Sequence, residues 1–119
     1  MKELALLAII VLLVGCVSSS AKEPRVEVTG ATVVVAPGHS LRDAVVQAAT
    51  RRHWCVQELT NGNLRCQIVQ RSNVVTIDVV IASETSYDIK LVESNIPNGK
   101  YNKWVNNLQR EIAKWAAGR

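Results

Sequence analysis

Residues 64–81 read LRCQIVQRSNVVTIDVVI, and residues 87–92 read YDIKLV. Apolar and polar side chains alternate through both stretches, which is the pattern of strands that bury one face. The polar residues 71–73 and 83–85 predict turns between these strands. We therefore expect consecutive antiparallel strands, joined by short turns, at the centre of the fold.

Two helices are predicted, one before and one after these strands in the chain. Ser40 is a typical N-cap with Asp43 at the capping-box position, and Arg51 and Arg52 mark the last turn of the first helix. The second helix is expected over about residues 101–117. Its apolar stripe has helical spacing and consists of Tyr101, Trp104, Val105, Leu108, Ile112 and Trp115.

Strands predicted over residues 26–35 and 54–59 complete the element order β-α-β-β-β-β-α. The chain of 119 residues is long enough for one small domain, which we place at residues 25–119. The expected fold class is α+β, an antiparallel β-meander with two helices packed on one face. The open face of the sheet is then mostly polar and carries Arg65, Gln67, Asp78, Asp88 and Lys90.

The amino-terminal residues predict export and a lipid anchor. Leu4 to Val14 is an unbroken apolar run of 11 residues, which fits a signal peptide and is too short to cross a bilayer. The run ends in Leu13-Val14-Gly15-Cys16, which resembles the bacterial lipobox, where the cysteine is acylated and the preceding peptide is removed. An ordinary signal peptide or an N-terminal anchor helix is the alternative.

The lipobox divides the chain into an anchor and a domain. Residues 1–15 are then a lipoprotein signal peptide, and residues 16–24 are the acylated Cys16 and a polar tether. Two or three acyl chains, such as palmitate, hold a protein on a membrane essentially permanently. No Asp follows Cys16, and by resemblance to enteric sorting this favours the outer membrane, with the domain on the periplasmic side. The inner membrane is the alternative.

The number of cysteines agrees with the lipobox, because assigning Cys16 to the lipid leaves Cys55 and Cys66 as a pair. In the oxidising periplasm a disulfide is the default. Asn-Gly at residues 61–62 predicts a hairpin turn between them. A four-residue loop, 59–62, places the two cysteines directly opposite, and we expect a disulfide in that register. A two-residue loop makes them diagonal, and a three-residue loop puts them on opposite faces. Two free, buried thiols are the alternative.

Catalytic and metal-binding patterns are weak. His39 precedes a helix cap and His53 follows a helix, so both histidines are expected at the surface. The chain has neither a Gly-x-Ser-x-Gly elbow nor a Gly-rich phosphate loop, and the spacing of Cys55 and Cys66 is not that of a zinc site. We expect no enzyme activity, no metal and no cofactor.

Two surfaces are candidates for binding a partner. Trp54 and Val56, with Val69 and Val80, could form an apolar patch on the open sheet face, although Trp54 could instead pack as core against a helix end. The net charge is +4, and the basic candidates are Arg51, Arg52, Lys103, Arg110 and Lys114. Export separates the chain from nucleic acid, so no nucleic-acid partner is expected. The prediction is a non-catalytic accessory module for an envelope protein, or a binding protein for an anionic envelope polymer or lipid.

Three motifs resemble a family of small, uncharacterised lipoproteins of Gram-negative bacteria. They are Ser-Leu-Arg-Asp-Ala at 40–44, Arg-His-Trp at 52–54, and Tyr-Asn-x-Trp-x-x-x-Leu at 101–108. The resemblance spans roughly residues 40–112 and implies the anchor, a helix that ends before a Trp, and an antiparallel meander. His53 stands where that family usually has Gly. The family has no established activity, so the resemblance implies no functional residue.

Overall fold

The computed structural model describes residues 23–119. The elements are β1 (Val28–Thr32), α2 (Leu41–Arg51), β2 (Cys55–Glu58), β3 (Leu64–Gln70), β4 (Asn73–Ile81), β5 (Ser86–Ser94) and α3 (Asn98–Ala116). This confirms the predicted α+β fold and its element order. The signal peptide, Cys16 and the first part of the predicted tether lie outside the described residues. Within residues 23–119, no helix has the length and apolar character needed to cross a membrane.

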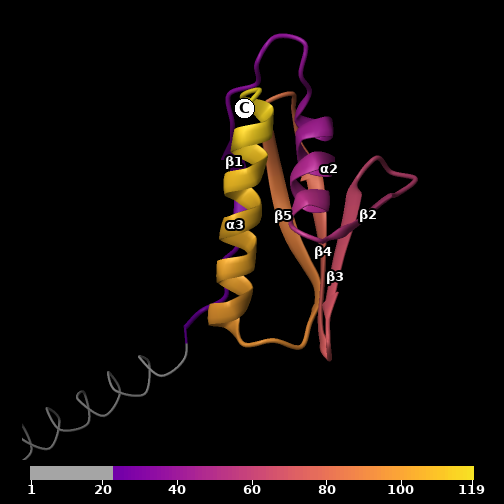
Figure 1. Cartoon of the computed structure of the whole chain (residues 1–119), viewed down its shortest axis with the longest axis vertical. Coiled ribbons are helices and arrows are strands. Elements are labelled where there is room, and N and C mark those ends of the chain that lie inside the picture. The colour runs from indigo at the N-terminus through magenta and orange to yellow at the C-terminus, as the bar shows by residue number, and fades with distance from the viewer. Residues whose placement is uncertain (1–22) are drawn as a thin grey trace, which may run out of the picture.

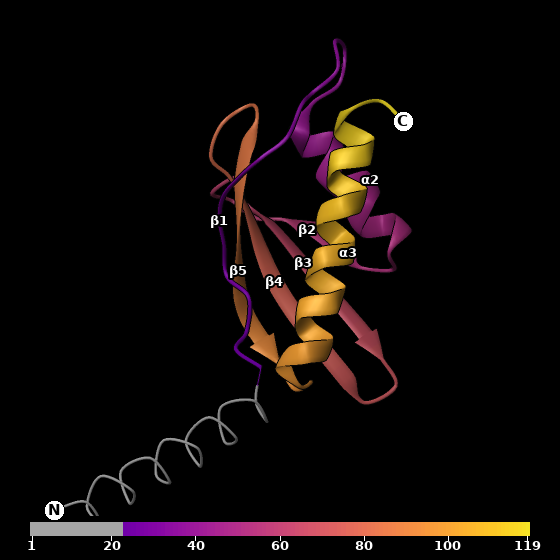
Figure 2. The same cartoon turned by 90° about the vertical axis from the view of Figure 1, so that its left-hand side faces the viewer.

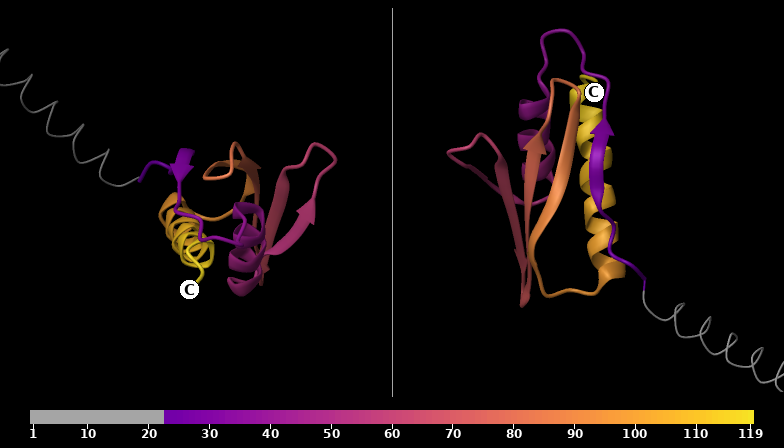
Figure 3. Two further views of the ribbon diagram at one scale, coloured as in Figure 1. Left: turned by 90° about the horizontal axis from the view of Figure 1, so that it is seen from above. Right: turned by 180° about the vertical axis from the view of Figure 1, so that it is seen from behind.

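The five strands form one antiparallel sheet in the order β1-β5-β4-β3-β2. Strands β2 to β5 are the predicted meander, and β1 adds to its far edge (Figure 1). The chain therefore crosses the width of the sheet between β1 and β2, and α2 lies in this crossing. Both helices cover the same face of the sheet (Figures 2 and 3).

The core lies between the helices and the sheet. Alternate residues of the strands point into it, which is the pattern that the sequence shows. The helix α2 contributes the small buried residues Ala44, Ala48 and Ala49. The largest fully buried side chains are Tyr87, Tyr101, Leu64, Ile77, Leu108 and Ile112.

The open face of the sheet is polar, as predicted. Arg65 on β3 forms an ion pair with Asp78 on β4, with Nε 2.8 Å from Oδ1 and Nη2 2.9 Å from Oδ2. This pairing raises the pKa of the Arg65 guanidinium. Gln67 donates a hydrogen bond to the hydroxyl of Thr76 at 2.9 Å.

Trp54 and Val56 do not contribute to the candidate apolar patch on the open sheet face. Trp54 is only 4% exposed and belongs to the core. Its backbone N–H donates to Ala49 O at 2.8 Å, in the turn that brings the chain back under α2. Val56 pairs with Cys66, whose side chain is buried on the helix side of the sheet, and Val56 itself is half-buried. The alternative for Trp54, a core side chain at the end of a helix, is the arrangement observed.

The Cys55–Cys66 disulfide is also absent from the structure, where both residues are free thiols. Cys55 pairs with Gln67, so Cys55 is exposed on the open face while Cys66 is buried on the other. The reason is the length of the hairpin loop. Leu59 N donates to Asn63 O at 2.9 Å, which closes a three-residue loop in place of the expected four. Asn61 Oδ1, which accepts from Asn63 N at 3.0 Å, stabilises this turn.

Candidate functional site

Charge is divided unevenly between the two helices and the rest of the domain. Residues 41–53 and 98–119, which contain both helices, carry eight Lys and Arg residues and two acidic residues. The rest of the described chain carries four basic and seven acidic residues. One acidic residue of the helix segments, Glu111, has its Oε2 buried. The surface that the helices present to solvent is therefore strongly basic, and we call residues 41–53 and 98–119 the basic helix layer.

The carboxyl end of α2 positions three residues of the basic helix layer, which are Arg51, Arg52 and His53. Arg52 N, His53 N and Trp54 N donate to the carbonyls of the last helical turn, at Ala48, Ala49 and Thr50. This is the Schellman arrangement, which needs a left-handed residue just beyond the helix. His53 occupies that position with φ of 71°. The turn holds the Arg51, Arg52 and His53 side chains at the surface.

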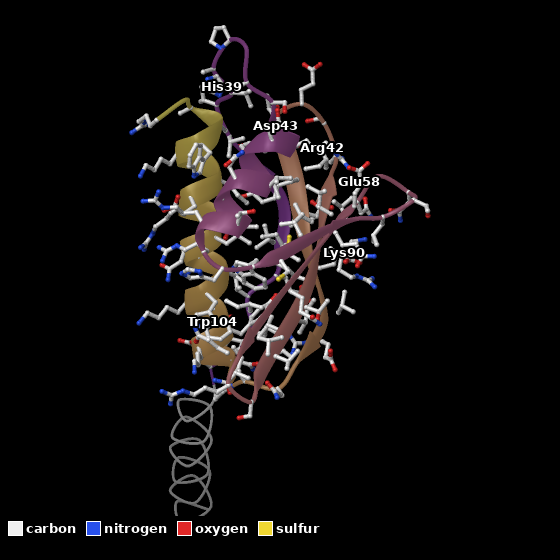
Figure 4. All side chains as sticks on the ribbon, turned by 45° about the vertical axis from the view of Figure 1, so that its right-hand side comes forward. His39, Arg42, Asp43, Glu58, Lys90 and Trp104 are labelled. Atoms are coloured by element: carbon white, nitrogen blue, oxygen red, sulfur yellow. The ribbon has the colours of Figure 1, made fainter. Side chains whose placement is uncertain are left out.

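These side chains border a small cavity of about 190 Å³ between the end of α2 and the first half of α3. We call it the basic notch and define it by Arg51, Arg52, His53, Trp104 and Asn107, with Trp54, Ile68 and Gln70 completing its lining. Lys100 lies one turn before Trp104, with its Nζ 5.2 Å from the centre of the indole ring. A further cation therefore stands beside the notch. Figure 4 shows Trp104 on the first half of α3.

The two arginines of the notch are unpaired within residues 23–119. The ion pairs of this part of the chain are Arg65–Asp78 and Arg42–Glu58, in which Arg42 Nη2 lies 3.0 Å from Glu58 Oε1 (Figure 4). Arg51 and Arg52 take part in neither. Their donors are free to bind an anion, and guanidinium groups bind phosphate and carboxylate with two parallel hydrogen bonds.

A larger cavity lies elsewhere, around the start of α2. It measures about 550 Å³ and is bordered by His39, Ser40 and Glu84 among others. The Ser40 hydroxyl accepts a hydrogen bond from Asp43 N at 3.1 Å and so serves as the predicted helix cap. Within the described residues, the His39 side chain forms no hydrogen bond to Ser40. The Ser40 hydroxyl therefore stabilises the amino end of α2.

The structure brings some of the predicted site residues together and separates others. Arg51 and Arg52 join in the notch, whereas Lys103, Arg110 and Lys114 are exposed along α3. Sequence reasoning placed Trp104 in the core stripe and missed Lys100 and Asn107. The spacing of Lys100 and Trp104, four residues apart on a helix, was the available signal for their contact.

No family model matches this chain, and searches of curated proteins and of solved structures also find no match. The resemblance to small lipoproteins therefore stays a prediction that rests on the quoted motifs.

Proposed function

We propose that this chain is a lipid-anchored envelope protein on the periplasmic side of the outer membrane, and that it acts without catalysis as an interaction module. The sequence that ends in Cys16 supports the anchor, and the basic helix layer is the proposed working surface. The observation that carries the proposal is the concentration of basic residues in the two helix segments. Such a field attracts and orients partners of dense negative charge.

The structure favours an anionic partner over apolar docking on the open sheet face. Trp54 and Val56, which were to form the apolar patch, point toward the core. Val69 and Val92 are exposed on other strands, at 60% and 48%. The sheet face also carries the Arg65–Asp78 ion pair, in which the charges already compensate each other. The helix layer has the larger uncompensated charge.

The basic layer can be tested on the full chain in neutral detergent, with a dextran sulfate matrix as a generic polyanion. Replacing Lys103 and Arg110 with Glu reverses two charges on α3. The control replaces Arg71 and Lys90 with Glu, which makes the same change of net charge away from the helices. We expect the salt concentration needed for elution to fall much further for the α3 pair. Equal falls for both pairs would show that net charge alone governs binding, and would contradict the proposal.

The anchor is tested separately by growing cells with an alkyne analogue of palmitate. The wild-type chain should carry the label and sediment with outer membranes in a density gradient. The Cys16→Ser chain should lose both properties. Label that persists without Cys16, or sedimentation with the inner membrane, would contradict the anchor or its location.

A further inference from the structure

We propose that the basic notch binds the phosphate group of an anionic phospholipid in the membrane that carries the anchor. The inference rests on the proposed function, because it takes the lipid anchor and the basic helix layer as given. It adds a defined site and one class of ligand. Four observations carry it: the exit point of the chain, the donors of the notch, its size, and the conformation of His53.

The first observation is that the chain leaves the domain at the start of α3. Asn102 Oδ1 accepts from Val26 N at 2.7 Å, and its Nδ2 donates to Pro24 O at 2.9 Å. Asn98 Nδ2 donates to Glu23 O at 3.0 Å. Residues 23–26 are thereby held on the first turns of α3. Glu23 and Pro24, predicted as tether, belong to the folded domain.

The remaining tether is short. Residues 17–22 separate Cys16 from Glu23, and a fully extended chain of this length spans at most about 25 Å. With Cys16 in the lipid, the start of α3 must stay within that distance of the membrane surface. Trp104 lies six residues after Asn98, or about 9 Å along the helix. The notch is therefore in the half of the domain that the anchor keeps near the membrane.

The second and third observations are the donors and the size of the notch. Arg51 and Arg52 offer guanidinium groups that are unpaired within residues 23–119, and the Asn107 amide adds a neutral donor. Lys100, held over the Trp104 ring, brings another positive charge to the edge. A volume of about 190 Å³ suits a phosphate group and is below that of sites for drug-sized ligands. Half-buried Trp side chains also favour the membrane–water interface.

The fourth observation is that His53 adopts a conformation that glycine adopts more readily. Its φ of 71° lies in the left-handed region, where a Cβ is unfavourable. The side chain is exposed and forms no hydrogen bond within the described residues, so packing does not explain its presence. Functional sites are one of the places where strained backbone of this kind is retained, and at His53 the strain coincides with the lining of the notch. His53 lines the notch together with the two arginines, and an imidazole N–H can donate a hydrogen bond to a phosphate oxygen.

The helix dipole of α2 opposes an anion at this end, and the structure limits that effect. The negative end of a helix consists of its last free carbonyls. Here the N–H groups of Arg52, His53 and Trp54 occupy the carbonyls of Ala48, Ala49 and Thr50. Arg51 and Arg52 belong to this turn and are exposed, and their two full positive charges exceed the partial negative charge of a helix end.

The test is a titration of the acylated full chain in neutral detergent, followed by NMR of the Trp104 indole N–H. Separate arms use short-chain phosphatidylglycerol, short-chain phosphatidylcholine and inorganic phosphate. We expect saturable binding of phosphatidylglycerol, with weaker binding in the other two arms. Inorganic phosphate that binds as tightly as phosphatidylglycerol, or a Trp104 signal that does not respond to the anionic lipid, would overturn the assignment.

Two variants distinguish the notch from the basic layer as a whole. Replacing Arg51 and Arg52 with Gln should weaken phosphatidylglycerol binding about 30-fold, at about fivefold for each basic residue at an anionic surface. The control replaces Lys103 and Arg110 with Gln, which removes the same charge outside the notch, and should cause a much smaller loss. Equal losses would overturn the notch and leave the proposed function intact. Loss of dextran sulfate selectivity would instead remove the proposed function itself.

His53→Gly gives a further variant in which folding is not at risk, because glycine suits the backbone there. We expect it to weaken phosphatidylglycerol binding severalfold while the domain stays folded. Unchanged binding in this variant would overturn the role of the imidazole in the site.

Discussion

His53 both forms the turn after α2 and lines the basic notch at the surface. The turn after α2 needs a left-handed residue, and a non-glycine side chain there costs about 1–2 kcal/mol. We therefore predict that His53→Gly raises the free energy of unfolding by about 0.5–1 kcal/mol, after the entropy of the unfolded glycine is deducted. Urea denaturation measures this change. Arg52→Gly is the control, because Arg52 has φ of −91° and gains nothing from glycine. A destabilised His53→Gly chain would contradict the account of the turn.

Cys66 predicts a pH dependence of stability. Burial, with a smaller effect of the Asp78 charge, raises the pKa of this thiol from 9.0 to about 12. The folded state thus keeps the thiol protonated, while the unfolded chain ionises near the ordinary value. The contribution of the protonated Cys66 thiol to the free energy of unfolding is fully present below pH 9. It is lost as the pH rises toward 12, by up to about 1.4 kcal/mol per pH unit.

Chemical denaturation of wild type and Cys66→Ala between pH 8 and pH 11 checks this prediction. Burial also raises the pKa of Tyr87 and Tyr101, so both chains should lose stability at the alkaline end. The wild-type chain should lose it more steeply from pH 9 upward. Parallel curves for the two chains would show that Cys66 does not contribute.

At the level of elements, α3 depends on a segment far from it in sequence. Pro97 supplies no side-chain cap, and the first turn holds no acidic residue. Glu23 compensates, because its Oε2 accepts from Asn102 Nδ2 at 3.2 Å and brings a negative charge to the amino end of the helix. The amino-terminal segment and α3 therefore stabilise each other.

Asn102→Ala should detach the amino-terminal segment, residues 23–26, from α3. The backbone groups of Val26 and Pro24 lose their partner, and we expect the free energy of unfolding to fall by about 1–2 kcal/mol. Trypsin should also cleave after Arg25 more rapidly, since residues 23–26 are no longer held. Asn106→Ala, on an exposed position of the same helix, is the matched control. Unchanged cleavage in Asn102→Ala would mean that these hydrogen bonds do not hold the segment.

The hairpin between β2 and β3 marks the limit of prediction at this scale. Asn61-Gly62 identified the turn correctly, but the same dipeptide fits loops of two, three or four residues. Changing the loop by one residue moves each side chain of a strand to the other face. The choice of three residues is what separates Cys55 from Cys66, and it depends on the hydrogen bonds around Leu59 and Asn63.

For the whole molecule, the division of charge follows from the topology. The arginines at 51–52 and the basic residues within 100–114 are far apart in the chain. They lie on one surface because α2 and α3 cover the same face of the sheet (Figure 3). The net charge of +4 in the sequence gives no hint of this separation. The basic surface that the two helices share therefore exists only in the folded domain.

The sequence by itself determined the strands, the helices, their order and the polar character of the open sheet face. These follow from local periodicity and from caps such as Ser40, which act within a few residues. Only the tertiary structure decided that Trp54 is core, that the two thiols are separated, and that Arg51, Arg52 and Trp104 form a notch. Each of these depends on the register of a strand pair or the packing of two helices. Such contacts are chosen by the burial of apolar surface across the whole domain, which no local pattern encodes.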